Sequence, residues 1–244
     1  MDDYYIFDKN IWITGASSGI GYEIVKALSN YNTNLILSAR NVDTLTSTAT
    51  AITGKAKMYA FPMDVSNTQS VNDTFEFISH EIGFPDILIN NAGYYHANAF
   101  LEITEEEFDK LIGTNLKGVF NTTRCVLPAM MEAGGGAVIN ICSIAALKEF
   151  KYATIYSAAK AGMLAMMNTL REEVRSHNIK IINIIPGATA TPIWSPKILD
   201  RHKHSMCSAA DVANTIIAAL KLCNTDTAMI EEIVVTPQIQ MGNF

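Results

Sequence analysis

Tyr156 and Lys160 stand four residues apart, and Ser143 precedes the tyrosine by thirteen residues at the end of an apolar run. On a helix, residues four positions apart lie on one face, so we expect the phenol and the ammonium to be neighbours. A nearby cation favours the phenolate, which predicts a pKa of Tyr156 shifted from about 10 towards neutral pH. Such a phenol could exchange a proton with an alcohol or carbonyl oxygen, and the Ser143 hydroxyl could donate a second hydrogen bond to that oxygen.

A glycine-rich turn joins the first expected strand to the first expected helix. The strand is Asn10–Thr14, and the segment Gly15–Gly21 follows with the spacing Gly-x-x-x-Gly-x-Gly. The apolar side of the helix is then formed by Ile20, Ile24, Ala27 and Leu28. Glycines let the backbone approach a pyrophosphate closely, and the helix N-terminus favours an anion. This context predicts a dinucleotide-binding turn.

Strand and helix patterns alternate along the whole chain. The expected strands are Asn10–Thr14, Asn34–Ala39, Ala56–Phe61, Asp86–Asn90, Ala137–Cys142, Lys180–Ile185 and Glu232–Thr236. The two longest expected helices are Glu105–Glu132 and Ile155–Ser176. Alternation of this kind predicts an α/β fold, a doubly wound seven-stranded parallel sheet with helices on both faces. We expect residues 1–244 to form one domain, with the chemistry at the carboxyl ends of the strands.

Further motifs follow the glycine turn in a fixed order. They are Asn90-Asn91-Ala92-Gly93, Asn115, Ser143, Tyr156, Lys160 and Pro186-Gly187. Together with Thr14–Gly21 they resemble the motif series of the short-chain dehydrogenase/reductases. This resemblance implies a single-domain Rossmann-type oxidoreductase that transfers hydride between a nicotinamide and a small carbonyl or alcohol substrate.

The resemblance also implies a catalytic role for four residues. Tyr156 would donate a proton in reduction and accept one in oxidation, and Lys160 would lower the pKa of Tyr156 and bind the nicotinamide ribose. Ser143 would hold the substrate carbonyl, and Asn115 would anchor a water that links Lys160 to solvent. The residues alone leave other roles open, since Asn115 could only bridge backbone groups at a helix irregularity and Ser143 could only cap a turn.

The implied cofactor site extends over several loops. Its residues are Gly15, Ser17, Ser18, Gly19, Ile20, Gly21, Arg40, Asp64, Val65, Asn91, Ala92, Gly93, Tyr156, Lys160, Pro186, Gly187, Thr189 and Thr191. Asp64 and Val65 resemble the pair that contacts adenine, and Asn91–Gly93 resembles the segment that lines its ribose. Thr189 and Thr191 resemble the positions that bind the carboxamide.

The end of the second strand predicts the choice of cofactor. Ser38-Ala39-Arg40 places no carboxylate there to bind both ribose hydroxyls, and the Arg40 guanidinium could pair with a 2′-phosphate. We therefore expect NADP(H) to be preferred, with NAD(H) possible. The alternative is that Arg40 is an ordinary surface residue at the start of a helix.

The substrate pocket is expected to be aromatic and mainly apolar, which suits a ring or a small ketone. Its expected residues are Tyr94, His96, Phe150 and Trp194. Trp194 could instead simply pin its loop to the body of the protein. Residues 186–194 and 230–237 also resemble bacterial sepiapterin-reductase-type members.

Composition excludes several classes of function. The net charge of −6 argues against a nucleic-acid partner, and no apolar stretch approaches the roughly 20 residues that span a membrane. The four cysteines lack Cys-x-x-Cys spacing, and His202 and His204 are interpreted as part of a solvated loop, so no metal site is expected. The acidic start, residues 1–5, lacks the pattern of a signal peptide. Together these features predict a cytoplasmic protein with reduced thiols.

Small residues line the helix that carries Tyr156, namely Ala158, Ala159, Ala161, Gly162 and Ala165. Such a face allows another helix to approach closely, within the chain or across a two-fold axis. The resemblance implies the second arrangement, a homodimer or homotetramer. A non-catalytic dinucleotide-binding regulator of the same fold is the alternative function, and a nucleotide-sugar epimerase or dehydratase fits the chain length and glycine spacing poorly.

Overall fold

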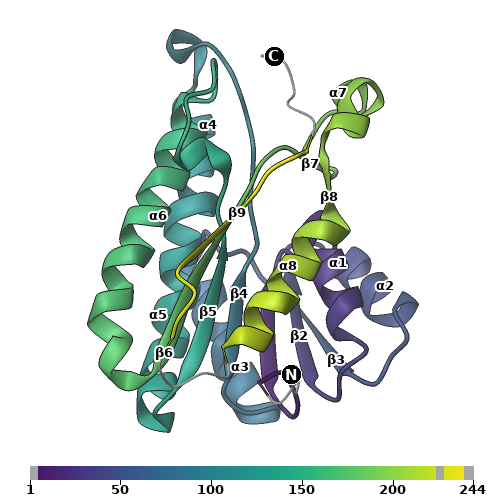
Figure 1. Cartoon of the computed structure of the whole chain (residues 1–244), viewed down its shortest axis with the longest axis vertical. Coiled ribbons are helices and arrows are strands. Elements are labelled where there is room, and N and C mark those ends of the chain that lie inside the picture. The colour runs from purple at the N-terminus through teal and green to yellow at the C-terminus, as the bar shows by residue number, and fades with distance from the viewer. Residues whose placement is uncertain (1–4, 224–227, 239–244) are drawn as a thin grey trace.

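The computed structural model describes residues 5–223 and 228–238, and it contains a seven-stranded parallel sheet (Figure 1). The strands follow the order β3-β2-β1-β4-β5-β6-β9. Their bounds are β1 Asn10–Thr14, β2 Asn34–Ala39, β3 Lys57–Pro62, β4 Ile87–Asn90, β5 Gly136–Ile141, β6 Ile179–Pro186 and β9 Glu232–Val235. The predicted fold class is confirmed, and every strand boundary lies within one residue of the expected one. Residues 1–4, most of the acidic start, lie outside the described ranges.

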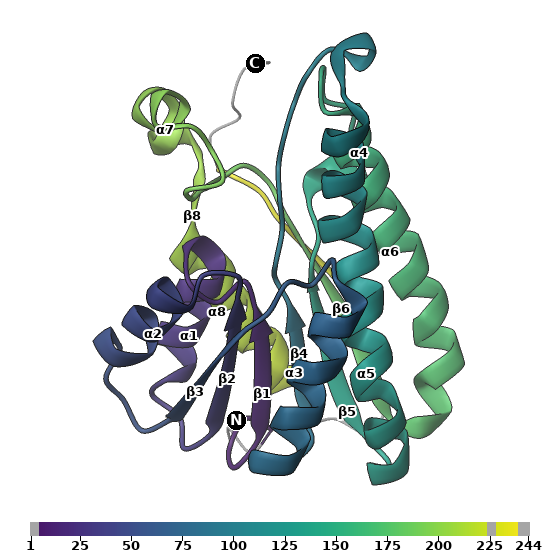
Figure 2. The ribbon, with the colours of Figure 1, turned by 180° about the vertical axis from the view of Figure 1, so that it is seen from behind.

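Six helices cover the two faces of this sheet (Figures 1 and 2). On one face lie α1 Gly19–Leu28, α2 Val42–Ala51 and α8 Ala209–Leu222. On the other face lie α3 Thr68–Glu81, α5 Gly118–Ala133 and α6 Thr154–Val174. The chain thus covers one face, crosses to the other and returns with α8, which gives the doubly wound arrangement that the sequence pattern predicts.

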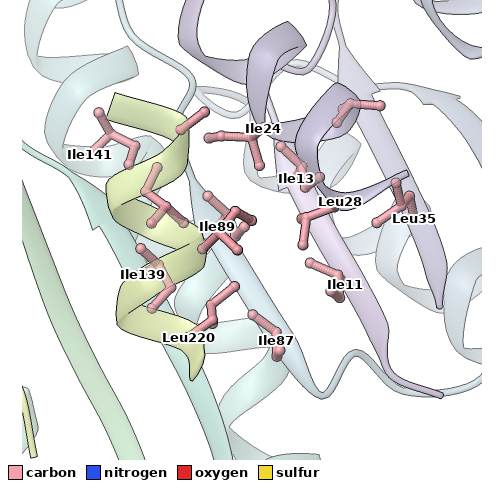
Figure 3. Packing of buried hydrophobic residues seen from close by; sticks show 14 of the residues in the cluster. Ile11, Ile13, Ile24, Leu28, Leu35, Ile87, Ile89, Ile139, Ile141 and Leu220 are labelled. Atoms are coloured by element: carbon pink, nitrogen blue, oxygen red, sulfur yellow. The ribbon is translucent and has the colours of Figure 1, made fainter. Parts of the chain in front are cut away.

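Side chains alternate between the two faces along each strand. In β1, Ile11 and Ile13 enter the cluster beneath α1 and α8, and Trp12 enters the opposite cluster. Figure 3 shows the first cluster, in which Ile89 and Ile139 of the sheet lie near Leu220 of α8. Both faces of the central strands are therefore buried, which explains their continuous apolar sequence.

The buried side of α1 differs from the expected one. Its buried residues are Gly21, Ile24, Val25 and Leu28. Ile20 and Ala27, which the pattern places on this side, are only partly buried against the cluster. Gly21 replaces Ile20 at the contact because the glycine turn brings this part of the helix directly against the end of β1.

The long helix expected over residues 105–132 is present as one helical run from Glu105 to Ala133, but a π-helical turn divides it. The chain forms α4 Glu105–Ile112, a π-helical turn Gly113–Lys117 and α5, which ends at Gly134 in the left-handed conformation. Within the π-helical turn, the Asn115 side chain donates a hydrogen bond to the carbonyl oxygen of Leu111 at 3.0 Å. A side chain that enters the backbone hydrogen-bond ladder is a known cause of such an interruption.

The segment after β6 is more ordered than the loop that the sequence analysis assumes. It contains the short strands β7 Thr189–Ala190 and β8 Cys207–Ser208, which pair in parallel, and the helix α7 Pro196–His202. Pro196 occupies the first turn of α7, a position where its fixed φ favours helix initiation. His202 therefore lies on a helix, not in a solvated loop.

Within residues 5–223 and 228–238, no helix combines the length and apolarity needed to cross a bilayer. The same ranges contain no group of three or more histidine, cysteine or acidic side chains arranged around a common metal position.

Candidate active site

The carboxyl ends of β1, β4, β5 and β6 lie along one edge of the sheet, and the predicted site residues follow them. β1 ends at Thr14 before the glycine turn, β4 ends at Asn90 before Asn91, and β5 ends at Ile141 two residues before Ser143. Beyond this edge, α4 and α7 project on either side (Figures 1 and 2). The parallel topology thus brings segments far apart in sequence to one place.

Three of the predicted catalytic residues meet at this edge. The Ser143 side chain hydrogen-bonds Tyr156, and its oxygen also accepts a bond from the Ala145 amide at 3.1 Å. Lys160, one turn further along α6, donates from Nζ to the carbonyl oxygen of Ile141 at 2.9 Å. Its Nζ lies 6.0 Å from the centroid of the Tyr156 ring. Ser143 therefore both caps a turn and reaches the phenol.

The prediction that the pKa of Tyr156 is lowered is wrong, because the surrounding groups of the protein raise it. Burial raises the pKa of Tyr156 to about 12, and the hydrogen bond with Ser143 opposes this rise only in part. Burial also lowers the pKa of Lys160, because a desolvated ammonium is disfavoured. Both pKa shifts have the same cause. The free-energy cost of moving either charge out of water exceeds the stabilisation that the neighbouring groups provide. The phenol is consequently held in its protonated form.

Asn115 is completely buried, and its side chain hydrogen-bonds backbone groups on two segments. Its Nδ2 donates to the carbonyl oxygens of Tyr94 at 2.8 Å and Leu111 at 3.0 Å, and its Oδ1 accepts from the Tyr94 amide at 3.2 Å. A Cβ built on Gly93 would lie 3.4 Å from Asn115 Oδ1 and 4.0 Å from Lys160 Nζ. Asn115 thus bridges backbone at the helix irregularity, one of the two roles left open, beside the Lys160 ammonium.

The glycine turn fits a diphosphate. Gly15 has φ +64°, and a Cβ there would stand 2.8 Å from Ala92 Cα. A Cβ on Gly21 would collide with the carbonyl oxygen of Gly15, so the helix can approach the turn only without a side chain. Within the described residues, the N-cap Ser18 accepts no side-chain bond from the first turn of α1. The amides at this helix start, with Ser17 beside them, are therefore left for an anion.

Asn91 and Asp64 use their side chains inside the protein. Asn91 Nδ2 donates to the carbonyl oxygens of Thr14 at 2.9 Å and Gly15 at 3.0 Å, which ties the glycine turn to β4. Asp64 Oδ1 accepts from the amide and hydroxyl of Ser66 at 2.9 and 2.7 Å. Val65 packs against Gly118 of α5. These residues shape the expected adenosine side of the site through their backbone.

The segment after β6 also approaches the glycine turn. The Gly187 amide donates to the carbonyl oxygen of Val235 at 2.7 Å, and Thr189 Oγ1 donates to the Gly187 carbonyl at 3.0 Å. A Cβ on Gly19 would stand 3.2 Å from Cβ of Thr191, so Thr191 lies directly over the start of α1. Pro186 is the last residue of β6.

Arg40 is exposed directly after β2, which ends at Ala39. Asn41 follows as the N-cap of α2, and its side chain accepts a bond from the Thr44 amide. The guanidinium is thus displayed at the carboxyl edge of the sheet, one strand away from the glycine turn.

The structure separates the predicted pocket residues into two groups. Tyr94 lies beneath Lys110 of α4, whose Nζ is 4.3 Å from the ring centroid, and His96 Nε2 lies 2.8 Å from Glu107 Oε1. Both therefore face α4. Phe150, at 43% exposure, lies in the segment between Ser143 and Tyr156. Of these four residues, Trp194 makes a ring contact with Tyr95, which in turn contacts the ring of Tyr156.

The ring that contacts Tyr156 is Tyr95, which the predicted site omits. Tyr95 and Tyr156 meet edge to face, with centroids 5.0 Å apart and planes at 85°. Tyr95 also contacts Trp194, with centroids 5.0 Å apart and planes at 54°. No periodic pattern applies to this loop, so sequence spacing could not distinguish Tyr95 from its neighbours.

Comparisons with known proteins agree with this geometry. A family model described as short chain dehydrogenase matches residues 9–202. The ketoacyl reductase HetN of a Nostoc species is 30% identical over 226 residues, which cover 89% of this chain and 77% of that protein. An alcohol dehydrogenase from the archaeon Thermococcus sibiricus, complexed with 5-hydroxy-NADP, has a TM-score of 0.85 at 26% identity, covering 97% of this chain and 99% of that one. The L-sorbose reductase from Gluconobacter frateurii, complexed with NADPH and L-sorbose, has a TM-score of 0.85 at 26% identity, covering 96% and 97%.

The family match spans the glycine turn, the Asn-Asn-Ala-Gly segment and the serine, tyrosine and lysine at the sheet edge. The fold agreement extends over nearly the whole of both related structures. The chain therefore belongs to the short-chain dehydrogenase/reductase family, and it is an NAD(P)-dependent oxidoreductase that acts on CH–OH and C=O groups.

Proposed function

We propose that this enzyme reduces a small carbonyl compound with NADPH and that Tyr156 donates the proton. The observation that carries the proposal is the convergence of Ser143, Tyr156 and Lys160 at the end of β5, beside a glycine turn that fits a diphosphate. The Tyr156 phenol is protonated at neutral pH, since burial raises its pKa, and it therefore has a proton to donate.

The bound nicotinamide supplies the hydride, and the residues of the chain handle the oxygen and its proton. Ser143 donates a hydrogen bond to the carbonyl oxygen as negative charge develops on it. The O–H bond of Tyr156 then breaks, its proton moves to that oxygen, and an alcohol and a phenolate result. The Lys160 ammonium lies on the same side of α6 and stabilises this phenolate. Asn115 holds the backbone of the π-helical turn beside Lys160.

Replacing Tyr156 with Phe tests the proposal directly. We expect kcat for NADPH-dependent reduction to fall by about 10²-fold or more, since general acid catalysis contributes a factor of that order. NADPH affinity, measured by fluorescence titration, should change little. Screening should include diketones, 3-oxo acids, acyl thioesters, pteridines and steroids. Full NADPH binding with no turnover of any carbonyl by the wild-type protein would favour a non-catalytic regulator instead.

Arg40 supports the proposed preference for NADPH. Its guanidinium is exposed at the end of β2, and the two related structures described above hold NADPH and 5-hydroxy-NADP. We expect kcat/KM to be higher with NADPH than with NADH, and Arg40→Asp should reverse or reduce that ratio. Lys55→Asp, at an exposed lysine just before β3 and so at the opposite edge of the sheet, is the control and should leave the ratio unchanged.

We also propose that α5 and α6 form an interface between copies of this chain. A surface groove of about 670 Å³ runs between them, and its apolar lining includes Phe120, Leu127, Met131, Ala165, Met166 and Leu170. Ala158, Ala161 and Ala165 are exposed, and Gly162 faces Leu116 of the π-helical turn. We expect light scattering to give a dimer or tetramer, and Ala165→Arg to produce monomers. A wild-type monomer at micromolar concentration would contradict the interface.

Two further expectations remain proposals. Residues 1–244 would form one domain, since the strands of a single sheet come from both ends of the described chain. A cytoplasmic location agrees with the four free cysteines, Cys125, Cys142, Cys207 and Cys223. Limited proteolysis and the localisation of a tagged protein would check them.

A further inference from the structure

Tyr95 and Trp194 form a continuous aromatic surface next to the catalytic phenol. Tyr95 comes from the loop after β4, and Trp194 comes from the segment between β7 and α7. The two ring centroids are 5.0 Å apart, and Tyr95 is in turn 5.0 Å from the ring of Tyr156. Two loops that are about a hundred residues apart in sequence thus meet over the proton donor.

Trp194 is held by hydrogen bonds within its own segment. Its indole Nε1 donates to the carbonyl oxygen of Thr189 at 3.0 Å, and its backbone amide donates to that of Thr191 at 3.2 Å. The indole N–H is engaged by this bond within its own segment. The indole both pins its segment and contributes to the aromatic surface.

Tyr95 is held by both of its neighbours in the chain. The amide and the carbonyl of Tyr94 bond to Asn115 at 3.2 and 2.8 Å, and His96 pairs with Glu107 at the start of α4. Both neighbours of Tyr95 are therefore anchored, and its ring is positioned by the contacts with Tyr156 and Trp194. A surface with such fixed positions binds a ligand without a large cost in ordering.

We propose that Tyr95 and Trp194 act as an aromatic wall that selects carbonyl substrates with a flat ring attached to or near the carbonyl carbon. The inference rests on the proposed function, since Tyr156 and Ser143 fix the carbonyl oxygen and so direct its substituent along the neighbouring rings. Flat rings pack against aromatic faces and edges in offset or tilted geometry. A saturated ring of equal size fills the same space without that interaction.

The test compares acetophenone with cyclohexyl methyl ketone, which have the same number of heavy atoms and differ in the flatness of the ring. The ratio of their kcat/KM values with NADPH is measured in the wild-type protein and in variants, which removes their different intrinsic reactivity. We expect Trp194→Leu and Tyr95→Leu to lower the ratio roughly 2- to 10-fold. Trp194→Phe and Tyr95→Phe keep a ring and should retain most of it.

Phe77→Leu is the control, because Phe77 lies on α3 with its ring against Phe61, away from the site. Its ratio should equal that of the wild-type protein. Unchanged ratios in both leucine variants, with carbonyl reduction intact, would overturn the aromatic wall and leave the proposed function in place. If a leucine variant does not fold, the matching phenylalanine variant and the binding measurement below decide the question.

A binding measurement separates the wall from the proposed function. The chain has two tryptophans, and Trp12 is completely buried, so the difference in emission between wild type and Trp194→Phe reports on Trp194. With NADP⁺ present, acetophenone should quench this emission saturably, and cyclohexyl methyl ketone should do so weakly. Saturable quenching without turnover of any carbonyl would contradict the proposed function and retain the wall. The absence of saturable quenching would contradict the wall.

Discussion

Ile139 and Asn140 are neighbours in β5, and their side chains enter opposite faces of the same sheet. Ile139 joins an apolar cluster covered by α1 and α8, as Figure 3 shows. Asn140 is completely buried on the face covered by α5 and α6, where Nδ2 of Asn90 donates to it at 3.0 Å. Its own Nδ2 donates to Asn183 at 3.0 Å. At this level of the sheet one face is built from packed hydrocarbon, and the other adds a row of matched polar partners to its own apolar cluster.

The polar partners form a ladder across the sheet. Asn90, Asn140 and Asn183 occupy the same register in β4, β5 and β6, and Asn183 continues to Asn168 of α6 at 2.8 Å. A shift of one residue in β5 would place isoleucines opposite these amides and leave them unpaired inside the protein. The apolar face can tolerate changes that conserve volume, whereas the ladder allows one register. The catalytic loops follow the ladder strands, so the specified face is the one that carries the chemistry.

Truncation of the apolar face should cause the largest loss of stability. Leu220→Ala removes a completely buried side chain from α8, and we expect the free energy of unfolding to fall by about 2–5 kcal/mol. Because Leu220 lies on the face away from Tyr156, kcat of the folded protein should stay close to the wild-type value. Urea denaturation and steady-state kinetics below the unfolding transition measure the two effects. A large fall in kcat would contradict the separation of the faces.

Truncation of the ladder should affect both stability and activity. In Asn140→Leu, the partners at Asn90 and Asn183 each lose a hydrogen bond, and each polar group left unpaired costs about 1–3 kcal/mol. We also expect kcat to fall, because the ladder continues to Asn168 of α6, the helix that carries Tyr156, and Ser143 follows two residues after β5 ends. Ile139→Ala is the matched control on the opposite face, with a comparable loss of stability and unchanged kcat. Equal kcat values in the two variants would show that the ladder does not position the site.

Alkaline pH should weaken the protein through a tyrosine on each face. The pKa of Tyr156 is raised to about 12 by burial, against about 10 in an unfolded chain. The folded state holds this proton more tightly, so the stabilisation is complete below pH 10 and is lost as pH rises through 12. The free energy of unfolding should fall by at most about 1.4 kcal/mol per pH unit for this group.

Denaturation at several pH values between about 9 and about 11 measures the slope of stability against pH. Tyr156→Phe should make the alkaline slope shallower. Tyr5→Phe should do the same, since Tyr5 packs against the apolar cluster and burial also raises its pKa. A slope that neither substitution changes would contradict the assignment of the effect to these phenols.

The smallest expected effects come from two capping boxes, one on each side of the sheet. Ser208 and Asp211 cap α8, and Thr104 and Glu107 cap α4. Ser208→Ala and Thr104→Ala should each cost about 1 kcal/mol. Only Thr104→Ala should raise KM for aryl ketones, because Glu107 also pairs with His96 beside Tyr95. Thermal denaturation and KM measurements in parallel compare the two variants. An equal KM in both would show that the α4 cap does not affect the substrate site.

Much of the fold and of the site can be predicted from local sequence. Apolar runs such as Ile11–Ile13 identify buried strands because each side chain must leave water on one face or the other. The glycine spacing identifies the turn because Gly15 needs a positive φ and Gly21 tolerates no side chain. The serine, tyrosine and lysine can be predicted because their elements end at, or begin from, the same sheet edge.

The interruption of the long helix and the order in the segment after β6 could not be predicted in this way. The π-helical turn depends on Asn115, whose bonds to Tyr94 join residues 21 positions apart. The pairing of β7 with β8 likewise joins Thr189 to Cys207. Local propensity does not contain such contacts, because they form only after the sheet has brought the segments together.

The sequence by itself determined the parallel sheet and the glycine turn, since each is encoded by a short pattern with its own physical cause. The proposed proton-handling residues came from the resemblance of the ordered motifs to one family. Tertiary structure alone decided that the pKa of Tyr156 is raised and not lowered, and that Tyr95 contacts its ring. Desolvation of Tyr156 and Lys160 depends on the atoms that surround them. The direction of a loop ring depends on anchors elsewhere in the chain, such as Asn115 and Glu107. Neither the desolvation nor the orientation of the ring is defined until distant segments have packed together.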